Sequence, residues 1–241
     1  MKLAVLSDIH SNAEALDAVV QDTRKWGAES YLVAGDIVGY GASPNECISI
    51  IKELGAGCVA GNHDWGVLER TSVSNFNRAA REAVLWTREK IGSASRTYLE
   101  SLPLTLEYEG ISLVHANFTD PDGWDYVFTL PGVARELDKI KTPIGIIGHS
   151  HVPFVTKKAD GWPDEIKSGS VHYSEGERFL VNVGSVGQPR DYDPRACYLR
   201  VDTESLELAL RRIEYDIESA QRKILDAGLP SSLAERLAVG Q

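Results

Sequence analysis

Five short apolar runs, each followed by side chains that can bind a metal ion, constrain this chain more than any other feature of its sequence. The first run, Lys2 to Leu6, has the length of a strand and leads into Asp8 and His10. In an α/β sheet, ligands collect at the carboxyl ends of the strands, so we expect the groups that follow these runs to meet in space. They include five of the six histidines. The groups are Asp8 and His10, Asp36, Asn62 with His63, His115, and His149 with His151.

Each of these motifs has a plainer interpretation when it stands alone. Asp8 would cap the next helix and His10 would be a solvated turn residue, while Asn62-His63-Asp64 would be a polar turn. Residues two apart on an extended segment point to the same side, which would bring Asp8 and His10 together. We favour a shared site because the same pattern recurs after five apolar runs.

The first part of the chain alternates between strand and helix patterns. Apolar residues recur at helical spacing over residues 13 to 26, and Ser43-Pro44-Asn45-Glu46 has the composition of a helix start. The apolar runs that end before Asp36 and Asn62 predict two further strands. A strand, helix, strand, helix, strand order predicts a parallel sheet covered by helices.

After the third motif the pattern becomes helical and later changes to strands. Residues 65 to 101 form a predicted helical insertion, which either lies over the site or packs as a layer on the sheet. Residues 216 to 241 form a predicted helical tail, and we treat residues 1 to 241 as one domain because no repeat or composition break divides them. A second sheet, stacked on the first, is predicted from strands at 153–157, 178–183, 196–202 and 206–214.

The composition indicates in which compartment the protein works and which partners it could bind. The net charge of −10 disfavours duplex nucleic acid, because binding a long backbone requires the neutralisation of many phosphates. No stretch approaches the ~20 apolar residues that span a bilayer, and Met1 runs directly into a strand pattern. We therefore expect a cytoplasmic protein without a membrane segment. Its three cysteines are expected to be reduced core residues.

The chemistry of the polar groups indicates which ions they would bind. Asp, Asn and His offer oxygen and nitrogen donors without thiolate, which suits Mn, Fe, Co, Ni or Zn better than it suits a structural cysteine-zinc site. There are more such groups than one ion needs. We therefore interpret them as a centre for two divalent metal ions with a shared carboxylate.

The order of these motifs resembles that of the calcineurin-like metallophosphoesterase superfamily. The series Asp-x-His, Gly-Asp, Gly-Asn-His-Asp, a lone His and Gly-His-Ser-His runs from residue 8 to residue 151, and the Gly184 to Arg190 stretch extends the match. Within the superfamily, the chain is similar to small bacterial and archaeal phosphodiesterases and dinucleotide-polyphosphate hydrolases. The resemblance implies an α/β fold, a four-layer α/β/β/α sandwich of two stacked, mostly mixed sheets flanked by helices.

The resemblance also implies a role for each motif residue. One metal would be bound by Asp8, His10, Asp36 and His151, and the second by Asp36, Asn62, His115 and His149, with Asp36 bridging. A hydroxide activated by both metals would attack phosphorus. His63, hydrogen-bonded to Asp64, would stabilise or protonate the leaving oxygen, so these two residues are the implied catalytic pair.

Three arginines are candidates for substrate binding. Arg78 and Arg81 begin the helix after the third motif, and Arg190 follows a glycine-rich turn, although Arg190 would equally pair with Asp191 or Asp193. An arginine fork can bind two oxygens of a phosphate that does not react. The aromatic loop at 117 to 128 would stack a base or belong to the core, and His172 is expected at the surface.

These observations predict a hydrolase that cleaves a phosphodiester, phosphomonoester or phosphoanhydride of a small, nucleotide-like substrate. A nuclease acting on short oligonucleotides is the alternative among enzymes, and a non-catalytic binding scaffold is the alternative from another class. The sequence leaves a homodimer open.

Overall fold

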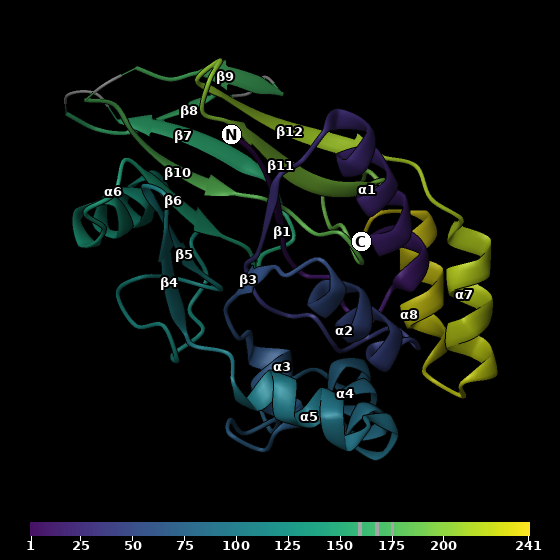
Figure 1. Ribbon diagram of the computed structural model, residues 1–241. Helices are drawn as coiled ribbons and strands as arrows, with labels where there is room; N and C mark the ends of the chain where they lie inside the picture. Colours follow the sequence, from purple (N-terminus) through teal and green to yellow (C-terminus); the bar gives the residue numbers. More distant parts are fainter. Residues whose placement is uncertain (159–160, 167–168, 175) are drawn as a thin grey trace.

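Two six-stranded mixed sheets lie face to face at the centre of the molecule (Figure 1). The computed structural model describes residues 1–158, 161–166, 169–174 and 176–241. The first sheet has the order β3 (Gly57–Cys58), β2 (Ser30–Val33), β1 (Lys2–Leu6), β11 (Ala196–Asp202), β12 (Glu207–Ile213) and β9 (Ser170–His172). The second has the order β4 (Thr105–Tyr108), β5 (Ile111–Val114), β6 (Ile144–Ile147), β10 (Arg178–Asn182), β7 (Phe154–Lys158) and β8 (Asp164–Ile166).

The membership of the two sheets corrects one expectation. Strands β1, β2 and β3 pair in parallel as predicted, but β11 and β12 continue this first sheet, because β11 pairs antiparallel with β1. The second sheet is instead built on β5, β6 and β10, which pair in parallel. A local pattern identifies a strand but does not tell which open edge it will join. The short strands β8 and β9 were not predicted.

Alternating side chains of the central strands create the layers. In β1, Leu3 and Val5 belong to the core between the sheets, together with Phe179 of β10. The intervening Ala4 and Leu6 belong to the core on the other face of the first sheet. All five side chains are fully buried, so both faces of β1 are covered.

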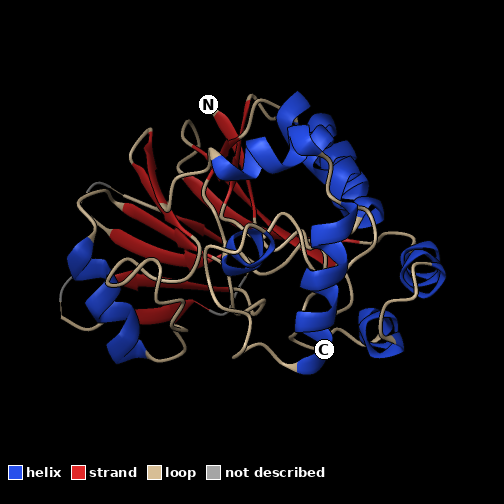
Figure 2. Ribbon diagram, turned by 90° about the horizontal axis from the view of Figure 1, so that it is seen from below, coloured by secondary structure: helices blue, strands red, loops and turns tan. Residues whose placement is uncertain are grey.

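Helices cover the outer face of each sheet. The first sheet is covered by α1 (Ala13–Trp26) and α2 (Pro44–Glu53), whereas α6 (Leu130–Lys139) packs on the outer face of the second sheet. The predicted tail forms α7 (Ile217–Asp226), α8 (Ser231–Glu235) and the 3₁₀ helix η1 (Arg236–Ala238). The view in Figure 2 shows the strands between the α6 side and the larger helical side. The result is the expected four-layer α/β/β/α sandwich.

The predicted insertion both packs on the body and reaches the ends of the strands. It contains the second half of α3 (Asn62–Val67), together with α4 (Arg78–Lys90) and α5 (Ser93–Glu100). Val84 of α4 and Leu99 of α5 are fully buried in the core beside the first sheet. The segment between α3 and α4 lines a cavity described below. Both proposed placements of the insertion therefore apply, each to a different part of it.

Within the described ranges, no helix combines the length and the apolar character needed to cross a membrane.

Candidate metal centre

One group of donor atoms gathers where β1 and β6 end. Nε2 of His151 lies 3.2 Å from Oδ1 of Asp8, and Nε2 of His10 lies 3.6 Å from the same oxygen. The two imidazole nitrogens are 3.1 Å apart. All three side chains are buried. Residues that are 141 positions apart in the sequence are thus brought together at the carboxyl ends of one strand from each sheet.

A second group gathers beside the first, after β2, β3, β5 and β6. Nε2 of His115 lies 3.3 Å from Oδ2 of Asp36 and 3.1 Å from both Oδ1 of Asn62 and Nδ1 of His149. The same oxygen of Asp36 lies 3.6 Å from Nε2 of His10 in the first group. Asp36 therefore faces both groups, and all the residues predicted to bind metals converge.

The backbone at these positions is not the extended chain that the sequence suggested. Asp8 and His10 have φ angles of 52° and 49°, in the left-handed region. Asp36, His149 and His151 share this conformation. Such conformations are strained for residues with a Cβ and persist only where surrounding contacts hold them. Here the backbone N–H groups of Asp8 and His10 donate to the carbonyls of Gly35 and Asp36 over 3.1 and 3.0 Å.

Two glycines make room for the carboxylates. A Cβ on Gly61 would lie 2.1 Å from Oδ1 of Asp36, and one on Gly148 would lie 1.9 Å from Oγ of Ser7 and 2.5 Å from Oδ2 of Asp8. No side chain fits at such distances. The glycines of the Gly-Asn-His-Asp and Gly-His-Ser-His motifs are therefore required by the close approach of each carboxylate to the neighbouring turn.

The protonation of the histidines in the first group fits a bound cation. Nδ1 of His10 lies 3.1 Å from the carbonyl oxygen of Val38, and Nδ1 of His151 lies 2.5 Å from that of Gln188. A carbonyl only accepts, so both Nδ1 atoms carry a proton and Nε2 is the nitrogen of each ring that a cation would bind. Oδ1 of Asp8 is buried beside them without a hydrogen-bond partner among the described residues. A cation between these atoms would satisfy all three.

The second group has the same character. Nδ1 of His115 donates to the carbonyl of Ala34 over 2.7 Å, so Nε2 is the ring nitrogen that faces the oxygens of Asp36 and Asn62. Burial lowers the pKa of His115, but the charge of Asp36 outweighs it and raises this pKa to about 9. The buried carboxylate thus demands a positive charge at this point, which a divalent cation would supply.

The expected hydrogen bond between His63 and Asp64 does not form. Asp64 instead accepts from the backbone N–H groups of Val38 and Gly61 over 3.1 and 3.0 Å. Nδ1 of His63 is buried without a partner among the described residues. The reason is that both residues lie in the first turn of α3, where neighbours in sequence do not face each other. Asp64 therefore fixes the turn that carries His63 and does not orient its imidazole.

Burial shifts the pKa of both residues in the metal-free protein. It lowers the pKa of His63 well below its usual range, so the imidazole is neutral. Burial, followed by the charge of Asp36, raises the pKa of Asp64 to about 7.

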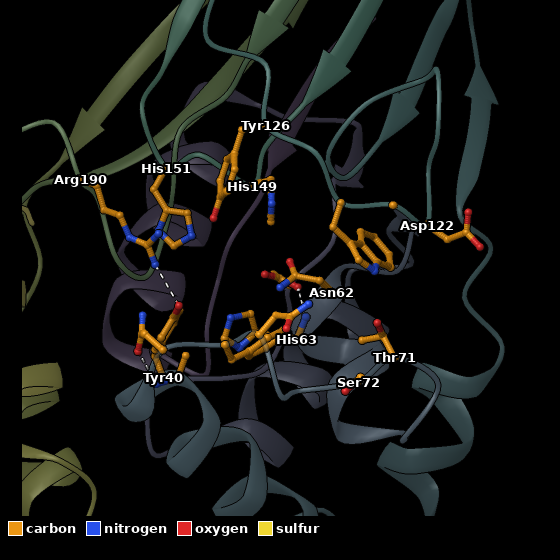
Figure 3. A pocket seen from close by; sticks show the side chains of 17 residues that line it. Tyr40, Asn62, His63, Thr71, Ser72, Asp122, Tyr126, His149, His151 and Arg190 are labelled. Carbon is orange, nitrogen blue, oxygen red and sulfur yellow. Dashed lines mark hydrogen bonds between the residues drawn. The ribbon is translucent and has the colours of Figure 1, made fainter.

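A cavity of about 580 Å³ opens over the donor groups (Figure 3). Sequence reasoning missed two aromatic residues beside the donor groups: the ring of Tyr40 lies 4.6 Å from that of His10 and 4.5 Å from that of His63, and Phe76 lies 4.9 Å from His63. The only local sequence signal that could have placed Tyr40 at the site is its position four residues after Asp36. The lining residues are Asp36, Tyr40, Asn62, His63, Thr71, Ser72, Asn75, Phe76, Asn77, Ala80, Asp122, Gly123, Trp124, Tyr126, His149, His151 and Arg190.

Of the three arginines predicted to bind substrate, only Arg190 lines this cavity. The side chain of Arg78 is 87% exposed and pairs with Glu82 over 2.7 Å, and Arg81 is exposed on the same helix. Neither placement supports a substrate contact. Arg190 does not pair with an aspartate: Asp191 pairs with Arg212, and Asp193 pairs with Arg195.

The aromatic loop reaches the site through stacked rings. Tyr126 stacks on His149 with ring centroids 4.1 Å apart, and Phe128 stacks on Tyr126 at 5.1 Å. Trp124 lines the cavity, whereas Phe118 packs against the core under α6. The loop therefore serves both the site and the core. His172 is exposed in β9, as expected.

Together, the four-layer sandwich and the two facing groups of buried carboxylate, amide and imidazole donors define a metal-dependent hydrolase. Residues 1–206 match the calcineurin-like phosphoesterase superfamily domain, and the chain belongs to this family. It is accordingly a metallophosphoesterase, a hydrolase that acts on phosphoester bonds.

Several relatives match over nearly the whole chain. An uncharacterised protein of Methanocaldococcus jannaschii is 40% identical over 243 residues, which cover 99% of this chain and 98% of the relative. The crystal structure of a metallophosphoesterase from Sphaerobacter thermophilus is 36% identical, with a TM-score of 0.88 and coverage of 100% of this chain and 99% of the other. A hypothetical protein from Pyrococcus horikoshii shares the fold, with 21% identity, a TM-score of 0.81 and coverage of 100% and 98%.

Proposed function

We propose that this phosphoesterase works with two divalent metal ions. One would be bound by Asp8, His10, Asp36 and His151, and the other by Asp36, Asn62, His115 and His149. The observation that carries the proposal is the position of Asp36, whose Oδ2 lies 3.6 Å from Nε2 of His10 and 3.3 Å from Nε2 of His115. Two cations ~3.5–4 Å apart repel each other and need an anion between them. The donor set suits Mn, Fe, Co, Ni or Zn.

In the reaction, the protein's own groups orient the phosphoryl group and stabilise the leaving oxygen. Bound cations would supply Lewis-acid stabilisation of phosphoryl oxygens and a lowered pKa of water. His63 lines the cavity with a neutral imidazole, so it would donate an N–H hydrogen bond to the leaving oxygen. Asp64 would act indirectly, by fixing the first turn of α3 through Gly61 and Val38.

The cavity favours a small, nucleotide-like substrate. Its volume of about 580 Å³ falls within the range of small-molecule sites, ~300–1,000 Å³. Trp124 and Tyr126 offer aromatic surface beside the donor groups, and Arg190 offers a cation. The net charge of −10 still argues against duplex nucleic acid. The three cysteines are buried and unpaired, which favours a reducing compartment such as the cytoplasm.

A substrate panel on metal-reconstituted protein tests this function. It should contain bis(p-nitrophenyl) phosphate, p-nitrophenyl phosphate, nucleotides, cyclic nucleotides, dinucleotide polyphosphates and short oligonucleotides. We expect metal-dependent hydrolysis that a chelator abolishes and that is faster on small nucleotides than on oligonucleotides. Faster cleavage of the oligonucleotides would favour the nuclease alternative. Metal binding without hydrolysis of any compound would favour a binding scaffold and overturn the proposal.

A further inference from the structure

Two arginines that are distant in sequence share one hydrogen-bond acceptor beside the cavity. Nη2 of Arg190 donates to Oε1 of Gln188 over 2.8 Å, and Nη1 of Arg236 donates to the same oxygen over 3.1 Å. Arg236 belongs to η1 in the C-terminal tail. Within the described part of the chain, neither guanidinium has a carboxylate side chain within 4.0 Å. Nε of Arg236 also donates to the backbone oxygen of Gln241, so Oε1 of Gln188 is the acceptor that the two positive charges share.

The two guanidiniums repel each other, and an anion between them would offset this repulsion. Burial, followed by the charge of Arg190, lowers the pKa of Arg236. Nε of Arg190 is buried and has no hydrogen-bond partner among the described residues. One donor of the pair is therefore unused, and the two guanidiniums share a neutral acceptor. A multiply charged anion that bound between them would remove the electrostatic cost of their repulsion.

The arginine pair is joined directly to the metal centre. The backbone carbonyl of Gln188 accepts from Nδ1 of His151 over 2.5 Å, and the backbone N–H of Arg190 donates to the carbonyl of His151 over 3.2 Å. Arg190 also donates to the Tyr40 hydroxyl over 3.1 Å, the contact drawn in Figure 3. The segment from Gln188 to Arg190 thus holds a proposed metal ligand with its backbone and gathers two guanidiniums with its side chains.

A second hollow lies next to the cavity, on the side of the C-terminal tail. It has a volume of about 510 Å³ and is lined by Asn77, Ala79, Ser232, Leu233, Glu235, Arg236, Val239 and Gln241. Asn77 lines both this hollow and the cavity over the donor groups. Arg190 lines the first and Arg236 the second, with Gln188 between them. A ligand that reached from the metal centre into the second hollow would pass this pair.

We propose that Arg190 and Arg236 form a site for a second phosphate of the substrate, one that is not cleaved. The inference rests on the proposed function, since the scissile phosphate is placed at the metal centre. The substrate would then be a phosphoester with a further phosphate group, whose remaining part extends along the C-terminal tail. A phosphate fits the site because a guanidinium fork binds two of its oxygens and because its double charge matches two cations. The site makes Arg236 a specificity-determining residue that no sequence motif indicates.

A binding experiment on chelator-treated protein tests this site independently of catalysis. The probes are methylenebisphosphonate, with two phosphonate groups, and methylphosphonate, with one, measured by calorimetry. We expect the bisphosphonate to bind more tightly, and Arg236→Ala to weaken it by about tenfold or more, as for the loss of a hydrogen bond to a charged group. Gln188→Glu should weaken it as well, because the new carboxylate would occupy the arginine pair. Arg222→Ala, which removes an exposed positive charge from the same tail, is the matched control.

A pair of chromogenic diesters extends the test to turnover. The p-nitrophenyl ester of thymidine 5′-phosphate has only the scissile phosphate, and its 3′-phosphorylated form has one more. We expect the wild type to favour the 3′-phosphorylated form in kcat/KM by about tenfold or more, and Arg236→Ala to lose most of this preference, while Arg222→Ala keeps it.

Equal bisphosphonate affinity in the wild type and in a folded Arg236→Ala variant would overturn the second site, whatever the activity. Hydrolysis of neither ester would count against the proposed function alone, and the binding result would still decide the second site. Circular dichroism of each variant separates loss of the site from loss of the fold.

Discussion

Oδ1 of Asp36 accepts a hydrogen bond from the backbone N–H of His63 over 2.8 Å. The turn that carries His63 therefore orients the carboxylate whose other oxygen faces both His10 and His115. One interaction thus couples the proposed bridging ligand to the proposed leaving-group residue. The coupling is through the backbone of His63, so the side chain of each residue can be changed separately.

Asp36→Asn and His63→Ala are expected to fail in different ways. Loss of the bridging charge at Asp36 should lower both the bound metal and the activity, because nothing then offsets the repulsion between two cations. His63→Ala should lower kcat by about 10²–10⁴-fold, the usual range for an acid–base group, and leave the metal content near that of the wild type. Elemental analysis and steady-state kinetics on the same preparations measure both effects. If both variants lost metal equally, His63 would be a metal ligand.

Gly148→Ala should remove metal without removing the fold. The added Cβ would lie 2.5 Å from Oδ2 of Asp8, so the carboxylate must move away from His10 and His151. We expect metal content and activity to fall together, while the circular dichroism spectrum changes little. Gly92→Ala is the matched control, since its Cβ would lie 3.5 Å from Oδ1 of Asn45 in ordinary contact. Normal metal content in Gly148→Ala would show that Asp8 is not needed for binding.

Chelation should destabilise the protein as well as inactivate it. A ligand present at about 100 times its Kd stabilises the folded state by about 2.7 kcal/mol. A bound ion would also relieve the repulsion among the donor atoms of Asp8, His10 and His151, which adds to this stabilisation. Thermal unfolding with EDTA, and then with added Mn²⁺ or Mg²⁺, measures this. Mn²⁺ should raise the Tm more than Mg²⁺, because imidazole nitrogen suits transition metals. An equal response to both ions would contradict the proposed nitrogen ligands.

Asp22 should make the stability of the fold depend on pH. Burial would raise the pKa of Asp22, but hydrogen bonds from the Tyr198 hydroxyl and the Arg200 guanidinium hold it below its usual value. The folded state therefore binds this proton less tightly than the unfolded state does. The resulting stability is present above the unfolded pKa of about 3.9 and is lost as the pH falls through the lower folded value.

Asp22→Asn should accordingly cost about 1 kcal/mol at neutral pH, and the difference from the wild type should shrink near pH ~3. Urea unfolding at the two pH values measures it. Asp17→Asn, an exposed change on the same helix, controls for the general loss of a negative charge. A destabilisation by Asp22→Asn that did not vary with pH would rule out the ionised carboxylate as its cause.

Local patterns were enough to find the groups of the site. Asp8, Asp36 and His115 each follow a buried strand, and alternation or continuous apolar runs reveal such strands without knowledge of the fold. The carboxyl-end rule then places the groups together. The same reasoning gave a wrong conformation for Asp8 and His10, because left-handed turns at non-glycine residues have no signature in the sequence.

Residues whose role depends on distant contacts were not recognised. Arg78 and Arg81 follow a site motif in sequence, yet both are exposed on α4 and neither lines the cavity. Arg236 lies 48 positions after Gln188 in the sequence. The two side chains come into contact only because the tail packs near Tyr40 and Ala80. Proximity in sequence is therefore a poor guide to which arginine reaches the cavity.

The sequence by itself determined the central strands, the helices that cover them and the set of donor groups, because each depends on side-chain periodicity and on the chemistry of single residues. Only the tertiary structure decided that β11 joins β1, that Asp64 binds the backbone instead of His63, and that Arg190 and Arg236 meet at Gln188. Those relationships depend on which surfaces of separate segments bury one another. That choice is made by the free energy of the whole packed chain and not by any one segment.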